Sequence, residues 1–179
     1  MKLGALFVLL ALGWFVSYAF LNNWVGPVGR IALGIVSGTL VYAVGYFFLK
    51  KKPVPGQVLL VLGATMILTT IVAARNVYEF FTPGLILALV GLVVFSTTVI
   101  AVYNNSLSLA TLAFIGGAIA PMMAHGLGDN YLMMTVYALI ISCGALVVSS
   151  IKGWRSLLLL ALAVMFIYTD SFYQLPERQ

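Results

Sequence analysis

Few residues in this chain could carry catalysis or bind a metal ion. The sequence contains a single histidine, His125, and the acidic residues expected on the same side of a membrane include Asp129 and Glu79. Zinc sites show several His or Cys ligands at recognisable spacing, whereas these three residues are irregularly spaced and the only cysteine, Cys143, lies in an apolar run. There is also no phosphate-binding glycine loop. The sequence therefore predicts no metal site, no cofactor and no catalytic residue.

Serine and threonine hydroxyls form a second set of chemically active groups. Thr65 and Thr69 lie in one apolar segment, and Ser96 and Thr97 lie in another. Such hydroxyls either bond the carbonyl one turn back or a neighbouring helix, or they line a polar path for a solute. We favour the first interpretation, because the centres of the apolar segments contain no ionisable residue of the kind that marks proton and ion pathways.

The segments that must position these residues are strongly apolar. Of the 179 residues, 63% are hydrophobic and 7% are charged, whereas soluble domains carry about 25% charged residues. A helix needs roughly 20 apolar residues to cross the hydrocarbon core of a bilayer. The sequence predicts a single all-α domain over residues 1–179, a polytopic transmembrane helix bundle of about seven spans arranged as consecutive helical hairpins. The expected spans cover residues 3–21, 31–49, 57–74, 84–102, 107–124, 131–151 and 156–170.

Charge in the connecting segments predicts the orientation of the bundle. The side that holds the N-terminus receives six of the nine basic residues, and all four acidic residues fall on the other side. Because cytoplasmic loops are enriched in Lys and Arg, we expect a cytoplasmic N-terminus and a C-terminus outside. The six are Lys2, Lys50, Lys51, Lys52, Lys152 and Arg155, and the remaining three are Arg30, Arg75 and Arg178.

The first twenty residues allow a second interpretation. They combine a short basic start with an apolar stretch, and Ser17-Tyr18-Ala19 loosely resembles a signal-peptidase site. The bulky side chains of Trp14 and Phe15 crowd that region. We therefore favour a first span that is retained in the mature protein.

Small residues on two consecutive segments predict a close helix contact. In lipid, helices associate through small residues that permit close backbone approach. Spacings of three and four residues keep such residues on one helix face. We expect the two faces to pack tightly against each other. The first face is Ala110, Ala113, Gly117, Ala120 and Ala124, and the second is Thr135, Ala138, Ser142, Ala145 and Ser149.

Glycine and proline mark two further backbone features. Gly34 and Gly38 form a GxxxG pattern, which marks either an intramolecular helix contact or a dimer surface, and we favour the intramolecular contact. Pro121 cannot donate to the carbonyl of Gly117, and its ring crowds that carbonyl. We expect the helix to bend or end at Pro121, near the turn "HGLGDN", in preference to a ligand site on a broken helix.

Three stretches, taken in order, resemble a known family. "YAFLNNWVGPVGRIALGIVSG" (18–38), "LSLATLAFIGGAIAPMMA" (107–124) and "KGWRSLLLLAL" (152–162) are similar to segments of the bacterial predicted membrane proteins grouped as domain of unknown function 2339. Members of that family are usually longer, so this chain resembles a minimal version or a part of one. The resemblance implies the bacterial cytoplasmic membrane and repeated helical hairpins. It implies no reaction and carries over no site residue.

These patterns favour a non-enzymatic, multi-pass inner-membrane protein that serves as a structural or interaction module of an envelope assembly. Its expected partners are the lipid bilayer and other membrane proteins or a second copy of the chain. No basic patch with interleaved aromatic residues points to nucleic acid. The alternative is a transporter or channel-like component for a lipidic or weakly polar small molecule. A membrane-embedded enzyme is a third interpretation and would require His125, Asp129 and Glu79 to meet.

Overall fold

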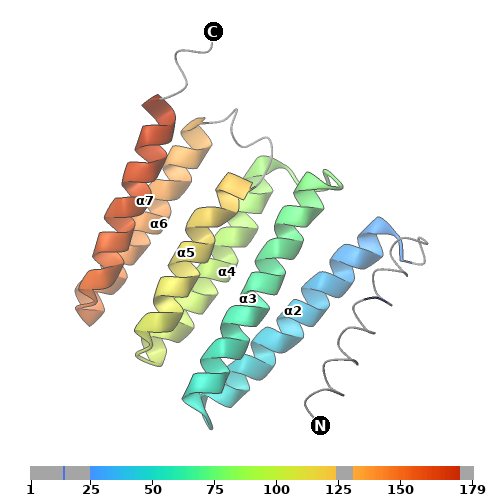
Figure 1. Cartoon of the computed structure of the whole chain (residues 1–179), viewed down its shortest axis with the longest axis horizontal. Helices are drawn as coiled ribbons and strands as arrows, with labels where there is room; N and C mark the ends of the chain where they lie inside the picture. The colour runs from blue at the N-terminus through green and yellow to red at the C-terminus, as the bar shows by residue number, and fades with distance from the viewer. Residues whose placement is uncertain (1–13, 15–24, 124–130, 174–179) are drawn as a thin grey trace.

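The computed structural model describes residue 14, residues 25–123 and residues 131–173. Six α-helices occupy almost all of this part of the chain (Figure 1), which confirms the all-helical prediction there. The expected first span, its signal-peptide alternative and the turn with His125 and Asp129 lie outside the described residues. The helices are α2 (Pro27–Leu49), α3 (Pro53–Asn76), α4 (Pro83–Tyr103), α5 (Leu107–Met123), α6 (Tyr131–Lys152) and α7 (Arg155–Tyr173).

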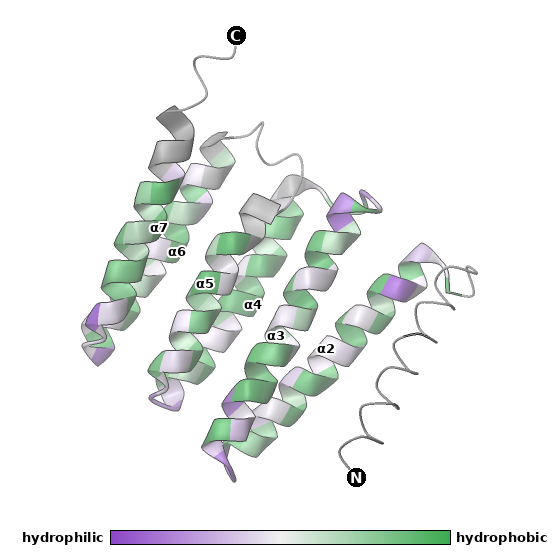
Figure 2. Cartoon of the chain, in the orientation of Figure 1, coloured by the Kyte–Doolittle hydropathy of each residue, from purple (hydrophilic) through white to green (hydrophobic). Residues whose placement is uncertain are grey.

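Four of these helices, α2, α3, α4 and α6, are long and apolar enough to cross a membrane. The helices α5 and α7 contribute shorter apolar stretches, Leu107–Ile119 and Arg155–Tyr168. In Figure 2 hydrophobic residues follow the helix shafts, and hydrophilic residues gather at several helix ends. Length and composition thus support four spans within the described residues, and the count of about seven stays a prediction.

Proline, asparagine and glycine set the helix boundaries. Three helices begin with a proline at their first position, namely Pro27, Pro53 and Pro83, where the missing N–H would have no partner within the helix. Between α4 and α5, Asn105 takes a φ of 50°, and between α6 and α7, Gly153 takes a φ of 68°. Asn and Gly tolerate this left-handed conformation best, so the chain reverses within short turns.

The helices form three hairpins, α2–α3, α4–α5 and α6–α7, which lie beside one another (Figure 1). Each hairpin has its most extensive contact between its own two helices. Between hairpins, α3 lies against α4 and α5, whereas α6 contacts α4 and α5 over smaller areas. The turns within the three hairpins all lie at the same end of the bundle (Figure 1). The arrangement as consecutive hairpins therefore agrees with the sequence pattern.

Glycines explain why α2 and α3 share the most extensive contact. A Cβ added at Gly45 would lie 2.5 Å from the backbone nitrogen of Leu60. A Cβ at Gly34 or Gly38 would lie 2.5 or 2.8 Å from a side-chain atom of α3. Real side chains do not tolerate such distances, so each of these positions requires glycine for the helices to approach this closely. The GxxxG pattern of α2 thus faces α3 of the same chain.

The expected tight contact between α5 and α6 requires a correction. The two helices touch, but α5 lies chiefly against α4, and α6 lies chiefly against α7. A Cβ at Gly117 would lie 2.6 Å from Val94 Cγ2 on α4, whereas the distance to Ile141 Cδ1 on α6 would be longer, 3.3 Å. On α6, Ala145 belongs to an apolar cluster that includes Leu157 of α7 as well as Ala110 and Phe114 of α5. Small residues therefore serve the contacts within hairpins more than the contact between these two hairpins.

The remaining residues of the two small faces differ in burial. Ala138 and Ser142 are buried, and Ala113 is partly buried. The side chains of Ala120 and Pro121 lie outside what the structure describes. The helix α5 ends two residues after Pro121, so the bend expected at that proline stays a prediction.

Two apolar clusters hold the hairpins together. The first joins α3 and α4 to Tyr137 of α6, and the second extends from Leu49 of α2 through α4 and α5 to Ala161 of α7. Many large apolar side chains remain exposed, among them Phe95 and Phe166. Lipid tails are as apolar as these side chains, so a bilayer can cover them without the cost that water would impose.

Candidate functional site

A lateral groove of about 880 Å³ lies between α4 and α6, and two buried residues of α5, Ala110 and Phe114, line it from within the bundle. We call it the α4–α6 groove. It extends along both helices to Tyr103 and Ile151 at the end with the hairpin turns, and it follows α4 for roughly 30 Å. Apolar side chains make up nearly all of its lining, including Leu87, Ala88, Val99, Met133, Val136 and Ile140.

Glycine widens this groove from both sides. Gly91 on α4 and Gly144 on α6 both line it, and a Cβ added to either would meet no atom within 4 Å. These glycines therefore do not permit close helix packing, as Gly34 and Gly45 do in the α2–α3 hairpin. Their missing side chains leave space at the surface between two hairpins. An elongated apolar molecule or chain could occupy that space.

Pro121 removes one backbone donor from α5, and the structure shows what replaces it. Proline has no N–H, so the carbonyl of Gly117, four residues earlier, lacks its donor within the helix. The Tyr137 hydroxyl on α6 donates to this carbonyl over 3.1 Å. The Tyr168 hydroxyl on α7 donates to the next carbonyl, that of Ala118, over 2.7 Å. Because an unsatisfied carbonyl costs several kcal/mol in lipid, Tyr137 stabilises α5 by replacing the missing donor, and Tyr168 adds a second hydrogen bond between α5 and the α6–α7 hairpin.

Basic residues surround the end of the groove. The Lys152 ammonium at the end of α6 donates to Asn105 Oδ1 in the α4–α5 turn. Tyr103 and Ile151, which line the groove, precede these two residues closely in the chain, so the contact lies near this end of the groove. Arg155 begins α7 nearby and is exposed. This end of the α4–α6 groove is therefore cationic.

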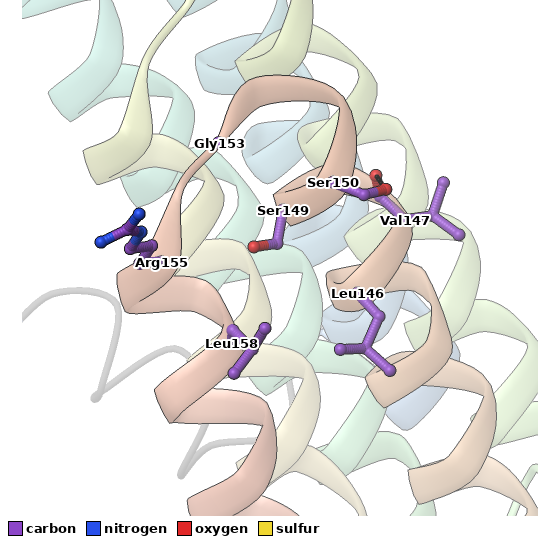
Figure 3. A pocket seen from close by; sticks show the side chains of 7 residues that line it. All are labelled: Leu146, Val147, Ser149, Ser150, Gly153, Arg155 and Leu158. Carbon is purple, nitrogen blue, oxygen red and sulfur yellow. Dashed lines mark hydrogen bonds between the residues drawn. The ribbon is translucent and has the colours of Figure 1, made fainter.

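A shallower pocket of about 580 Å³ lies at the α6–α7 turn (Figure 3). Ser149 and Ser150 come from α6 and Arg155 comes from α7, with Gly153 between them (Figure 3). The Ser149 hydroxyl donates to the carbonyl of Trp154 over 3.0 Å, and the Ser150 hydroxyl donates to that of Val147 over 2.8 Å. Both hydroxyls thus stabilise the backbone of the turn, and Arg155 supplies the positive charge at the edge of this pocket.

The four hydroxyl residues predicted for a polar path do not meet in one place. Thr65 and Thr69 are exposed in a second groove, of about 640 Å³, beside α5. Each donates to a carbonyl of α3 over 2.8 Å, Thr65 to Val61 and Thr69 to Thr65. Their hydroxyl protons are therefore satisfied within α3 itself.

Ser96 and Thr97 point elsewhere, and Thr97 is only 2% exposed. Both donate to the carbonyl of Val93, over 2.9 and 2.7 Å. The Tyr42 hydroxyl on α2 lies 3.3 Å from Ser96 Oγ and 3.1 Å from Thr97 Oγ1. This cluster ties α2 to α4 across α3. Sequence reasoning missed Tyr42, although a tyrosine in an apolar span usually requires a partner for its hydroxyl.

The opposite end of the bundle holds the described part of the expected acid–base set. Glu79 is exposed in the α3–α4 turn with a φ of 52°. Nearby, Arg75 donates to the carbonyl of Phe81 over 2.8 Å, and Arg30 donates to the Tyr78 hydroxyl over 3.4 Å. Among the described residues, no group of three or more His, Cys, Asp or Glu side chains could hold a metal ion.

Comparison with known families decides where this chain belongs. The model of the family described as "Predicted membrane protein (DUF2339)" matches residues 1–174. The chain is a member of the DUF2339 family. No curated protein and no solved structure matches it.

Membership of DUF2339, together with the four long apolar helices, makes this a multi-pass membrane protein in contact with lipid. The family description states no reaction and no ligand. The role of this DUF2339 member therefore has to follow from the arrangement of its own residues. Within the described residues, the α4–α6 groove and its cationic end are the features that sequence patterns did not predict.

Proposed function

We propose that this DUF2339 protein is a non-enzymatic interaction module of the bacterial inner membrane, with about seven spans and a cytoplasmic N-terminus. In this proposal the α4–α6 groove receives an apolar membrane component, as part of an envelope assembly. One observation carries the proposal: Gly91 and Gly144 leave open space on both sides of a groove that follows α4 along its length. Apolar binding sites of this kind are concave and mostly lined by hydrophobic side chains.

The hydrogen bonds of the bundle support an apolar occupant. The hydroxyls of Thr65, Thr69, Ser96 and Thr97 all bond carbonyls of their own helices. Tyr137, which lines the α4–α6 groove although those four residues do not, is bonded to the carbonyl of Gly117. Their polar groups are therefore already satisfied inside the bundle and present little to a polar solute.

A photo-crosslinking experiment in native membranes tests this function. A photoreactive amino acid at Ile140, which is 65% exposed in the groove, is compared with one at Phe166, which is 75% exposed on α7. We expect a discrete set of adducts from Ile140 and only bulk lipid from Phe166. Replacing Gly144 by Leu should suppress the Ile140 adducts, because the added side chain fills the groove. Identical adducts from both positions, unchanged by Gly144→Leu, would contradict the proposal.

A second candidate is a transporter component for a lipidic or weakly polar molecule. It is favoured by the exposure of Thr65 and Thr69 in the groove beside α5, where Gln57 and Ser108 add further polar atoms. The test is movement of a fluorescent phospholipid between leaflets of vesicles that contain the purified protein. Movement that is lost in a Thr65→Val, Thr69→Val variant would support transport. An absence of protein-dependent movement would exclude this candidate for that lipid.

A further inference from the structure

The two ends of the α4–α6 groove differ in charge. At one end, Lys152 bonds Asn105 Oδ1, and these two residues follow the lining residues Ile151 and Tyr103 closely in the chain. The same end of the bundle carries Lys50, Lys51, Lys52 and Arg155, with no acidic residue among the described residues there. At the other end, the lining residues are Gly84 and Met133, which bring no charge. An occupant that is apolar along its length and anionic at one end would complement this groove.

Lys152 has hydrogen-bonding capacity for such an anionic group. A lysine ammonium has three donors, and the contact with Asn105 Oδ1 uses one of them. Tyr103 is 85% exposed at the same end and adds a phenol beside the groove. Basic pockets between transmembrane helices bind the head groups of anionic lipids.

The depth of the groove fits an acyl chain. One leaflet contributes about half of a hydrocarbon core of roughly 30 Å. Along a helix at about 1.5 Å per residue, Gly144 lies roughly 12 Å from Lys152. By the same measure, Gly91 lies roughly 18 Å from Tyr103. The space at Gly144 thus lies within the roughly 15 Å of one leaflet when a head group rests at Lys152, and Gly91 lies about 3 Å deeper, near the middle of the bilayer.

The groove admits an acyl chain along its length. It has a volume of about 880 Å³ and follows α4 for roughly 30 Å, and an acyl chain is thin enough to lie between α4 and α6. The positive charge near one end, and not the size of the groove, favours an anionic lipid over another helix.

We infer that an anionic phospholipid occupies the α4–α6 groove, with its phosphate at Lys152 and one acyl chain against Gly91 and Gly144. This inference rests on the proposed function, because it names the apolar component that the groove receives. It adds two specific elements, the charge of the head group and the end of the groove at which it binds.

Native mass spectrometry of the full chain tests this inference. The purified protein is offered phosphatidylglycerol and phosphatidylcholine with identical acyl chains. We expect the protein to retain phosphatidylglycerol in preference to phosphatidylcholine by about five-fold, the effect of one basic residue near a lipid surface. Lys152→Gln should abolish this preference while phosphatidylcholine binding persists, because the glutamine amide can still donate to Asn105. The matched control is Lys51→Gln, which removes a charge from the α2–α3 turn and should change nothing.

Blocking the groove separates the two proposals. Gly144→Leu, or Gly91→Leu on the other side, should reduce the retention of both lipids while the melting temperature stays near that of the original protein. If both lipids bind equally and Lys152→Gln has no effect, the head-group inference is wrong, and the proposed function, which requires only an apolar occupant, stands. If neither blocking variant reduces lipid retention, the groove binds no lipid. A protein helix crosslinked at Ile140 in place of lipid would overturn the lipid inference, whereas the proposed function as an interaction module would stand.

Discussion

At the scale of single residues, glycine has two opposite roles in this bundle. Gly45 permits backbone contact, since a Cβ there would lie 2.5 Å from the nitrogen of Leu60. Gly144 faces open space, since a Cβ there would meet no atom within 4 Å. Both lie inside apolar helices and not at their ends, and a glycine in a helix interior lowers helix stability relative to alanine. The first glycine is required by packing, and the second maintains an opening.

Alanine substitution distinguishes these roles. We expect Gly45→Ala to destabilise the protein by roughly 1–3 kcal/mol, because the methyl group meets backbone atoms that cannot rotate away. We expect Gly144→Ala to be neutral or to stabilise by up to about 1 kcal/mol through helix propensity. Thermal unfolding in detergent measures both. Equal losses in the two variants would contradict the assignment of Gly144 to an open groove.

Ser142 gives a second prediction at this scale. Its Oγ is buried and has no hydrogen-bond partner among the described residues, whereas Ser149 Oγ donates to the carbonyl of Trp154. Burying an unsatisfied polar group is costly, while losing a formed hydrogen bond costs roughly 0.5–1.5 kcal/mol. Ser142→Ala should therefore keep or raise the melting temperature, and Ser149→Ala should lower it. A similar decrease in both variants would show that the Ser142 hydroxyl also has a stabilising partner.

At the scale of helices, the stability of α5 depends on its neighbours. Pro121 withholds a donor from the carbonyl of Gly117, and Tyr137 of α6 supplies one. Tyr168 of α7 bonds the next carbonyl. In a helix without proline, a backbone N–H of α5 would bond the Gly117 carbonyl. Because Pro121 has no N–H, the carbonyl is bonded by the α6–α7 hairpin, which couples α5 to that hairpin.

A double-mutant cycle tests this coupling. Tyr137→Phe should destabilise the protein by roughly 1–3 kcal/mol, because it leaves the Gly117 carbonyl buried and unsatisfied. In a Pro121→Ala background the restored N–H can bond that carbonyl, so the same substitution should cost clearly less. Thermal unfolding of the four proteins gives the coupling energy. Tyr168→Phe is the control, since its acceptor at Ala118 has a donor within α5, and its cost should not depend on Pro121.

At the scale of the whole molecule, the bundle has one strongly basic end. The α2–α3 turn carries Lys50, Lys51 and Lys52, and Lys152 and Arg155 flank the α6–α7 turn. The other end carries Arg30, Arg75 and Glu79 among the described residues, and the two arginines donate to Tyr78 and Phe81 there. Since Lys and Arg accumulate in cytoplasmic loops, we expect the end with the hairpin turns to face the cytoplasm.

Thiol labelling tests this orientation. In a Cys143→Ala background, Lys51→Cys should react with a membrane-impermeant maleimide only after the cytoplasmic side is opened. Glu79→Cys should react in intact cells once the outer membrane is permeable, because the α3–α4 turn is expected outside. The reverse labelling pattern would contradict the orientation and would place the cationic end of the groove on the outer side.

Sequence patterns predicted much of the fold and little of the candidate site. Hydrophobic length predicted α2 to α7 closely, although α2 and α3 begin earlier than the expected spans, at Pro27 and Pro53. The GxxxG pattern of Gly34 and Gly38 correctly pointed to close packing, yet equally small faces on α5 and α6 turned toward other partners. A small residue specifies that close approach is permitted, but it does not specify which helix approaches.

By itself, the sequence determined that this chain is helical and suited to a membrane. Proline and the length of each apolar span act on their own segment of the chain, and the apolar composition acts through the solvent that it requires. The tertiary structure decided which glycines pack and which leave space, because this depends on the distance from each glycine to the neighbouring helix. It also paired Tyr137 with the carbonyl freed by Pro121, and Lys152 with Asn105 at the end of the groove. Those pairs join residues far apart in the chain, and only the packing of the hairpins brings them together.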